Sequence, residues 1–197
     1  MTKAERTRQF IIEKTAPVFN MKGFSGTSLS DLTEATGLTK GSIYGNFSDK
    51  DEVAVAVFEY NIKRLNSGIN AAAASGANTI DKLLKMAEFH REQFKTSASR
   101  GGCPILNTAI DADDTHPLLK DKVARSIRAW KENIEKIVQE GIVKKEIKSS
   151  VNAAEFSTEF ISLVEGGIML AKATNDIALL STAVNRVKRI INSELKI

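Results

Sequence analysis

A short stretch near the N-terminus carries polar side chains at the spacing of a helix face. Ile43 and Phe47 lie four residues apart, which predicts a helix whose apolar side points into a core. The outward side then presents hydrogen-bonding groups: Thr39, Lys40, Ser42, Tyr44 and Asn46. Gly41 costs a helix about 1 kcal/mol relative to alanine, so we expect another backbone or a ligand, such as a phosphate chain, to come close there. These groups are suited to hydrogen bonding with a polar partner and not to building a core.

A second short helix is expected just before this one. Ser28 can cap it, and Asp31 favours its positive N-terminal end. Gly37 ends it, and Thr39 can cap the following helix, so the turn between them is very short. Two short helices joined in this way are typical of a helix-turn-helix unit that reads DNA. The alternative is a plain helical hairpin inside an all-α domain, with its tyrosine half-buried.

The run from Thr27 to Lys50, with the preceding Lys22-Gly23-Phe24, closely resembles the DNA-binding domain of the tetracycline-repressor (TetR) family of bacterial transcription regulators. The family pattern of a tyrosine, an aromatic residue three positions on and then a lysine is matched by Tyr44, Phe47 and Lys50. The resemblance implies base-edge or backbone contacts with double-stranded DNA from Thr39, Lys40, Gly41, Ser42, Tyr44 and Asn46. It also implies phosphate contacts from Thr27, Ser28 and Lys50. Many relatives carry an aromatic residue and a histidine where Gly45 and Asn46 stand, which leaves the operator sequence open.

The composition excludes several other classes of protein. The formal net charge of +4 is compatible with nucleic acid but is only mildly basic. The single cysteine excludes an intramolecular disulfide, and two distant histidines without a Cys/His/Asp cluster predict no metal site and no cofactor. The charged N-terminus has neither a signal peptide nor a membrane anchor, so we expect a cytoplasmic protein. No motif of an esterase, a phosphate-binding loop or a nucleophile-base pair favours an enzyme.

The helical periodicity predicts an all-α chain of nine helices in two domains. A three-helix DNA-binding domain takes residues 1–50, and a helix over about 49–69 links it to a ligand-binding and dimerisation domain at 70–197. The expected breaks are a loop at 70–78, the SASRGG loop before a short helix opened by Pro104, and the Asp-Thr-His-Pro run that ends at Pro117. The remaining helices are expected at about 79–96, 118–142, 152–173 and 176–195.

The last two helices carry more apolar surface than one narrow stripe requires. A four-helix interface between two subunits would bury it, and the TetR resemblance implies the same pairing. The alternative is packing within one protomer. The residues expected at the interface of a homodimer are Phe160, Val164, Gly166, Gly167, Leu180, Val184, Val187 and Ile191.

The resemblance further implies a repressor that a small apolar or aromatic effector releases from a palindromic operator. Candidate pocket residues are Phe89, Phe94, Cys103, Asn107, Trp130, Phe160 and Met169, although each also suits a plain core. We interpret His90, His116 and the cluster Asp111, Asp113 and Asp114 as structural or solvated groups. Cys103 precedes a helix start and follows Arg100, so it is either a reactive thiol switch or a residue that fills space. The alternatives are therefore a ligand-independent or a thiol-reactive regulator and, more remotely, a helical enzyme.

Overall fold

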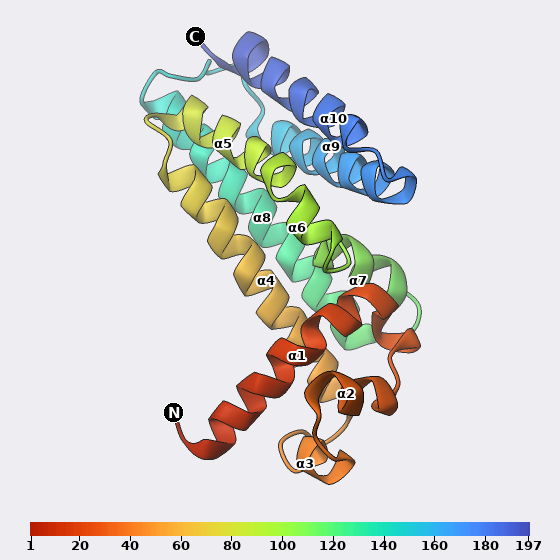
Figure 1. Cartoon of the computed structure of the whole chain (residues 1–197). Helices are drawn as coiled ribbons and strands as arrows, with labels where there is room; N and C mark the ends of the chain where they lie inside the picture. The colour runs from red at the N-terminus through yellow and green to blue at the C-terminus, as the bar shows by residue number, and fades with distance from the viewer. The chain divides into compact units, whose positions relative to one another are not determined.

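The computed structural model describes all residues from Met1 to Ile197 and contains no strand, which confirms the all-α prediction (Figure 1). Ten α-helices are followed by a π-helical turn at Ile191–Leu195. The helices are α1 (Lys3–Gly26), α2 (Leu29–Thr36), α3 (Lys40–Tyr44), α4 (Lys50–Ala74), α5 (Thr79–Glu92), α6 (Phe94–Ala98), α7 (Pro104–Ala112), α8 (Pro117–Val143), α9 (Ala153–Thr174) and α10 (Ile177–Ile190). The tenth helix arises because the single helix expected at 79–96 is divided into α5 and α6.

The prediction that residues 70–74 belong to a loop is wrong. Helix α4 continues through the four alanines to Ala74, and the loop begins only after it. Alanine has the highest helix propensity of all residues, so a run of alanines extends a helix even where no apolar stripe remains to be buried. The small and polar composition of this segment therefore did not mark the end of the helix.

The chain forms two compact units, which differ from the two expected domains. Unit 1 comprises Met1–Arg64 and Ser99–Ala124, and unit 2 comprises Leu65–Ala98 and Arg125–Ile197. Helices α4 and α8 therefore each contribute residues to both units. Unit 1 includes α7 because this helix packs on α1, far from it in the sequence.

The core of unit 1 forms between the inward stripe of α1 and the first turns of α4. Ile11, Ala16 and Phe19 of α1 are buried, as are Val57 and Phe58 of α4. Gly23 interrupts α1 with a φ of +73°, and one further turn ends at Gly26. A side chain at Gly23 would collide with the Asp111 carboxylate, because a Cβ there would lie 2.6–2.9 Å from its atoms. The glycine thus allows α7 to approach the break in α1.

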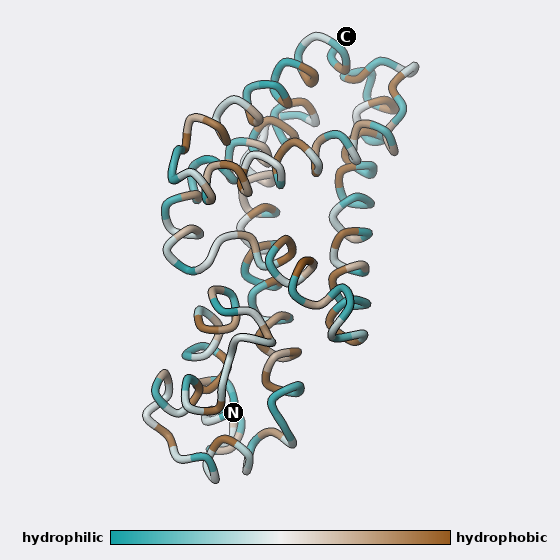
Figure 2. Tube along the Cα trace, turned by 90° about the vertical axis from the view of Figure 1, so that its right-hand side faces the viewer, coloured by the Kyte–Doolittle hydropathy of each residue, from teal (hydrophilic) through white to brown (hydrophobic).

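Unit 2 contains the closely packed pair α9 and α10, with α5 against α10. A Cβ at Gly167 would lie 2.8 Å from the Cβ of Ala183, so glycine lets the two helices come together. Figure 2 shows apolar and polar stretches alternating along the helices, as amphipathic packing requires. No helix has both the length and the apolar composition needed to cross a membrane.

The core of unit 2 takes up most of the residues expected between subunits. All of them except Gly166 are buried inside the protomer itself: Phe160, Val164, Gly167, Leu180, Val184, Val187 and Ile191. The apolar groups that stay exposed on these helices are Met169 (46%), Leu170 (47%) and Ile177 (38%), and a side chain at Gly166 would meet open space. The broad apolar surface of α9 is explained by its packing against both α10 and α5. Apolar composition alone does not tell whether a helix packs against its own chain or against a second subunit.

Candidate nucleic-acid interface

Helix α2 begins with a complete capping box. The Ser28 hydroxyl accepts the Asp31 N–H at 3.2 Å, and the Asp31 carboxylate accepts the Ser28 N–H at 2.8 Å. Lys22, near the end of α1, donates to Asp31 at 2.5 Å. This contact and the bonds from Ser28 lower the pKa of Asp31 to about 2, because each of them stabilises the ionised carboxylate. The exposed start of α2 is therefore fixed to α1 through an ionised aspartate.

The turn between α2 and α3 is formed by local rules. Gly37 adopts a left-handed conformation with a φ of +68° and donates its N–H to the Thr33 carbonyl at 2.8 Å. Thr39 then caps α3 by accepting the Ser42 N–H at 3.2 Å. The predicted helix-turn-helix geometry of Ser28, Gly37 and Thr39 is thereby confirmed.

Helix α3 has a buried and an exposed side. Ile43 is fully buried and Phe47 is 2% exposed, which confirms the inward pair. Thr39, Lys40, Gly41 and Ser42 are exposed, and Tyr44 and Asn46 are half-buried. The Asn46 amide donates to the Ser42 carbonyl at 2.9 Å and closes the end of the helix. A Cβ at Gly41 would meet nothing nearer than 4.0 Å, so no contact inside the protein requires a glycine there.

Arg8 of α1 holds the far end of α3 in place. Its guanidinium donates to the Asn46 carbonyl at 2.5 Å, pairs with Glu52 at 2.7 Å and lies 4.0 Å from the centre of the Phe47 ring. The Ser48 N–H and Arg8 together lower the pKa of Glu52. Arg8 was not among the residues expected to serve the site. The one sequence signal for it is its place seven residues before Thr15, on the same inward face of α1.

All three expected phosphate contacts already make hydrogen bonds within the protein, and those of exposed Ser28 are the bonds with Asp31. Thr27 is 1% exposed and its hydroxyl donates to the Gly23 carbonyl at 2.6 Å, so this side chain is not available to a phosphate and we remove it from the set. Lys50 donates to the carbonyls of Phe24 at 2.9 Å and Thr27 at 3.1 Å. A lysine has three donors, so only one of them remains for a phosphate. The carbonyls at the end of α1 already explain a lysine in the first turn of α4.

The candidate ligand residues are divided between the two units. Cys103 and Asn107 belong to unit 1, whereas Phe89, Phe94, Trp130, Phe160 and Met169 belong to unit 2. Phe160 is fully buried and Met169 is exposed. Cys103 is 6% exposed at the start of α7, and Asn107 faces α1. Each unit therefore has to be considered separately for a ligand.

The two histidines are buried, and Asp111 is not a solvated helix end. The rings of His90 and Trp130 lie 5.3 Å apart, and neither His90 Nε2 nor Trp130 Nε1 has a hydrogen-bond partner. Burial lowers the pKa of His90 to about 4. His116 accepts the Leu119 N–H through Nδ1 at 3.2 Å. Asp111 accepts the Phe24 N–H at 2.5 Å, which corrects the expectation of a solvated carboxylate.

Comparison with known proteins gives consistent matches over both units. The sequence profile of the tetR family of bacterial regulatory proteins matches residues 11–57, and that of the C-terminal domain of tetracyclin repressor-like proteins matches residues 79–187.

Two solved structures of TetR transcriptional regulators are similar over the whole chain. The regulator from Cytophaga hutchinsonii is 41% identical, covers 100% of this chain and 98% of its own, and has a TM-score of 0.92. The regulator from Chloroflexus aurantiacus is 34% identical over 100% of both chains, with a TM-score of 0.95. A curated HTH-type transcriptional regulator from the lacX 3′ region of Lactococcus lactis is 24% identical over 92% of this chain and 91% of its own.

Proposed function

Because the chain belongs to the TetR family of bacterial transcriptional regulators, whose members bind operator DNA, we propose that it is a homodimeric repressor released by a small effector. Two copies of α3 would enter successive major grooves of a palindromic operator. The protein would act in the cytoplasm. The observation that carries this proposal is the exposed polar side of α3, held from behind by Ile43, Phe47 and Arg8. This is a binding role and not a catalytic one.

The proposed DNA contacts lie on the exposed side of α3 and on its half-buried end at Tyr44 and Asn46. Base edges and the nearby backbone are read from α3 and its flanks by Thr39, Lys40, Gly41, Ser42, Tyr44 and Asn46. Ser28 at the exposed start of α2 and the remaining Lys50 donor bind phosphates, with the Ser28 hydroxyl turning from the Asp31 carboxylate to the phosphate. Specific base contacts give sequence preference, whereas phosphate contacts set the register on the duplex.

The proposed dimer surface is the exposed apolar patch of Gly166, Met169, Leu170 and Ile177. Met169 and Leu170 lie three and four residues after Gly166 and therefore share one face of α9 with it, and Ile177 starts α10. Exposed apolar side chains grouped in this way favour a subunit contact, and the open space at Gly166 would let a partner helix come close.

Two alternatives to a non-covalent effector remain: a reactive thiol at Cys103 and a regulator that responds to no ligand. A thiol switch at Cys103 is disfavoured by the burial of this residue, because a reactive cysteine needs access to its reagent. A ligand-independent regulator would have no groups set aside for a small molecule. The unpartnered buried nitrogens of His90 and Trp130 instead support an effector that supplies hydrogen bonds.

Selection of bound sequences from a random duplex pool tests the DNA-binding role. We expect enrichment of an inverted repeat whose half-sites are separated by about one helical turn or a multiple of it. Enrichment of a single, unrepeated half-site would contradict the dimeric arrangement. No enrichment over competitor DNA at moderate salt would contradict sequence-specific binding itself.

A further inference from the structure

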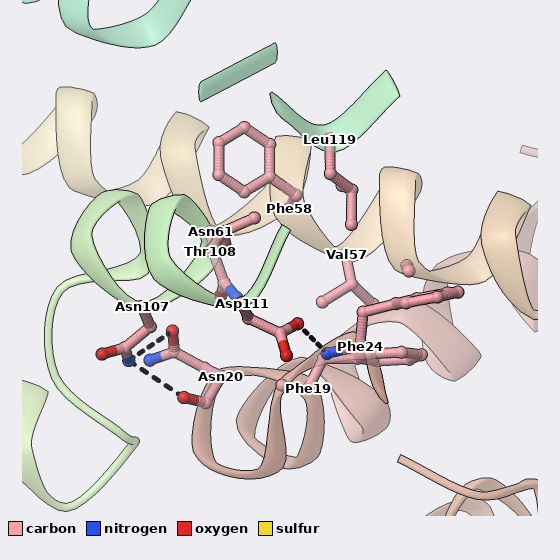
Figure 3. Close-up of a pocket in the computed structure, with 12 residues that line it drawn as sticks. Phe19, Asn20, Phe24, Val57, Phe58, Asn61, Asn107, Thr108, Asp111 and Leu119 are labelled. Atoms are coloured by element: carbon pink, nitrogen blue, oxygen red, sulfur yellow. Dashed lines mark hydrogen bonds between the residues drawn. The ribbon is translucent and has the colours of Figure 1, made fainter. Parts of the chain in front are cut away.

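Unit 1 contains a pocket between α1, α4, α7 and the start of α8 (Figure 3). About 30 Å³ of it is open to a water-sized molecule, which is room for an ammonium head group and leaves the attached chain to lie along the pocket mouth. We propose that this pocket binds a small organic cation, a primary ammonium group on a short apolar chain, and that this ligand weakens operator binding by acting directly on α1. The effect on the operator rests on the proposed function, whereas the binding does not.

The floor of the pocket is apolar. Val57 and Phe58 of α4 and Leu119 of α8 are each less than 5% exposed, and Phe19 and Phe24 of α1 complete the wall. The close-up shows these side chains arranged around the polar groups of α7. Such a wall suits a hydrocarbon chain, because covering it removes apolar surface from water.

One end of the pocket is closed by two asparagines whose donors are already used. The Asn107 amide donates to the Asn20 carbonyl at 2.9 Å and to its side-chain oxygen at 3.2 Å, as the dashed lines in Figure 3 show. The Asn20 amide donates to the carbonyls of Arg100 at 2.6 Å and Gly102 at 3.0 Å. This end therefore joins α1 to α7 and its preceding loop and does not await a ligand.

The remaining polar groups are acceptors or can serve as acceptors. Neither the Asn61 amide nor the Thr108 hydroxyl makes a hydrogen bond within the protein, although both line the pocket. Asp111 accepts the Phe24 N–H through Oδ2, and no lysine, arginine or histidine pairs with its carboxylate. A half-buried carboxylate served by only one neutral donor is complemented best by a cation with several N–H groups. A primary ammonium has three such donors, one for each of these side chains.

The same carboxylate holds the backbone next to the break in α1. The Phe24 N–H donates to the Asp111 carboxylate, and the Phe24 carbonyl accepts from the Lys50 ammonium. Helix α2 begins only a few residues later. A cation bound at Oδ1 of Asp111 draws charge from the carboxylate and so weakens the bond that Oδ2 accepts from the Phe24 N–H. Because Asp111 contacts both the ligand and the backbone that leads into α2, ligand affinity and operator affinity are coupled. By linkage, each ligand then weakens the binding of the other.

Three probes with one chain length and different head groups test the binding: n-butylammonium chloride, n-butanol and sodium butyrate. Protein labelled with ¹⁵N at asparagine reports on the pocket through the side-chain amide signals of Asn61 and Asn107. We expect n-butylammonium to shift these signals with a millimolar Kd, at least about tenfold tighter than butyrate. Equal affinities for the three probes, or no shift up to about 50 mM, would overturn the proposal.

Matched variants locate the site. Asn61→Leu and Thr108→Val should each weaken n-butylammonium binding by about fivefold or more, since each removes one acceptor without breaking a bond in the protein. Asn66→Leu is the control, because this exposed asparagine stands on the same helix and does not line the pocket. Asp111→Asn tests the charge, provided that its spectrum shows a folded chain. Unchanged binding in both Asn61→Leu and Thr108→Val would place the ligand elsewhere and refute the site.

The effect on DNA is measured separately with the selected operator. We expect saturating n-butylammonium chloride to lower operator affinity at least about threefold relative to sodium chloride at the same concentration, a control that the salt dependence of DNA binding requires. An unchanged affinity would refute the coupling while the spectra still decide the cation site. If the protein binds no operator at all, the proposed function fails and the binding result stands on its own.

Discussion

The ammonium of Lys50 lies 4.2 Å from the centre of the Phe24 ring and donates to the Phe24 carbonyl at 2.9 Å. It also donates to the Thr27 carbonyl, so one side chain ties the start of α4 to the end of α1 and to the link that leads into α2. The placement of the helix-turn-helix therefore depends on a cation that α4 contributes.

Lys50→Met should reveal whether this cation acts on the fold, on DNA or on both. We expect the free energy of unfolding to fall by about 1–3 kcal/mol, because two carbonyls lose a charged donor. Urea denaturation measures this loss. If Lys50 also contacts a phosphate, the salt dependence of operator binding should weaken by about one unit of slope. An unchanged slope with reduced stability would assign Lys50 to the fold alone.

Gly41→Ala separates the needs of α3 from those of the DNA. The protein has room for this methyl group, and alanine favours a helix, so stability should rise by up to about 1 kcal/mol. Operator affinity should nevertheless fall, since a methyl group at this exposed place would meet the approaching DNA. Fluorescence anisotropy with the selected operator measures this change. A more stable variant with wild-type affinity would show that α3 does not approach DNA at Gly41.

Tyr44→Ala should weaken binding to the selected operator by about 1–3 kcal/mol and binding to unrelated duplexes much less, because base contacts carry the sequence preference. Competition assays at fixed salt concentration give both affinities. An equal loss on all duplexes would instead indicate that Tyr44 contacts the DNA backbone or supports α3.

His90 should make the protein sensitive to mild acid. Its pKa is lowered to about 4 by burial, whereas the unfolded chain takes up a proton near pH 6.5. The stability that depends on a neutral His90 is therefore present above pH 6.5 and is lost as the pH falls towards 4, with a slope approaching about 1.4 kcal/mol per pH unit. His90→Phe should remove this slope while leaving the contribution of the carboxylates. Parallel curves of stability against pH for the two proteins would disprove the assignment.

Exposed and buried positions of α9 should respond differently to substitution. Met169→Asp should convert a dimer to a monomer at micromolar concentration while the protomer stays folded, because this side chain is exposed. Gly167→Ala should instead destabilise the protomer, since its Cβ would lie 2.8 Å from that of Ala183. Sedimentation velocity and urea denaturation distinguish the two effects. A wild-type chain that sediments as a monomer would refute the dimer surface.

Local chemistry explains which parts of the site could be predicted from the sequence. Ser28, Gly37 and Thr39 act on residues within a few positions of themselves, so their roles as caps and turn can be derived from spacing alone. Ile43 and Phe47 follow from the helical period in the same way.

The contacts that hold this unit in place join residues far apart in the chain. Arg8 meets Asn46 and Glu52 across about 40 positions, and Asp111 meets Phe24 across 87. No periodicity reports such pairs. Likewise, the apolar residues of α9 and α10 gave no sign of whether they face a helix of the same chain or a second subunit.

Helix α3 consists of five residues and is held by Arg8, Ile43 and Phe47 on its inner side. Its outward side chains therefore contribute little to the packing of the protein. Exposed Lys40 and Gly41 can change with little loss of folding free energy. Such a surface is open to rapid evolutionary drift, because new preferences for DNA can be sampled without first acquiring compensating mutations elsewhere. The same separation makes the protein a convenient scaffold for retargeting, in which a library confined to α3 would search for new operators while the rest of the chain remains untouched.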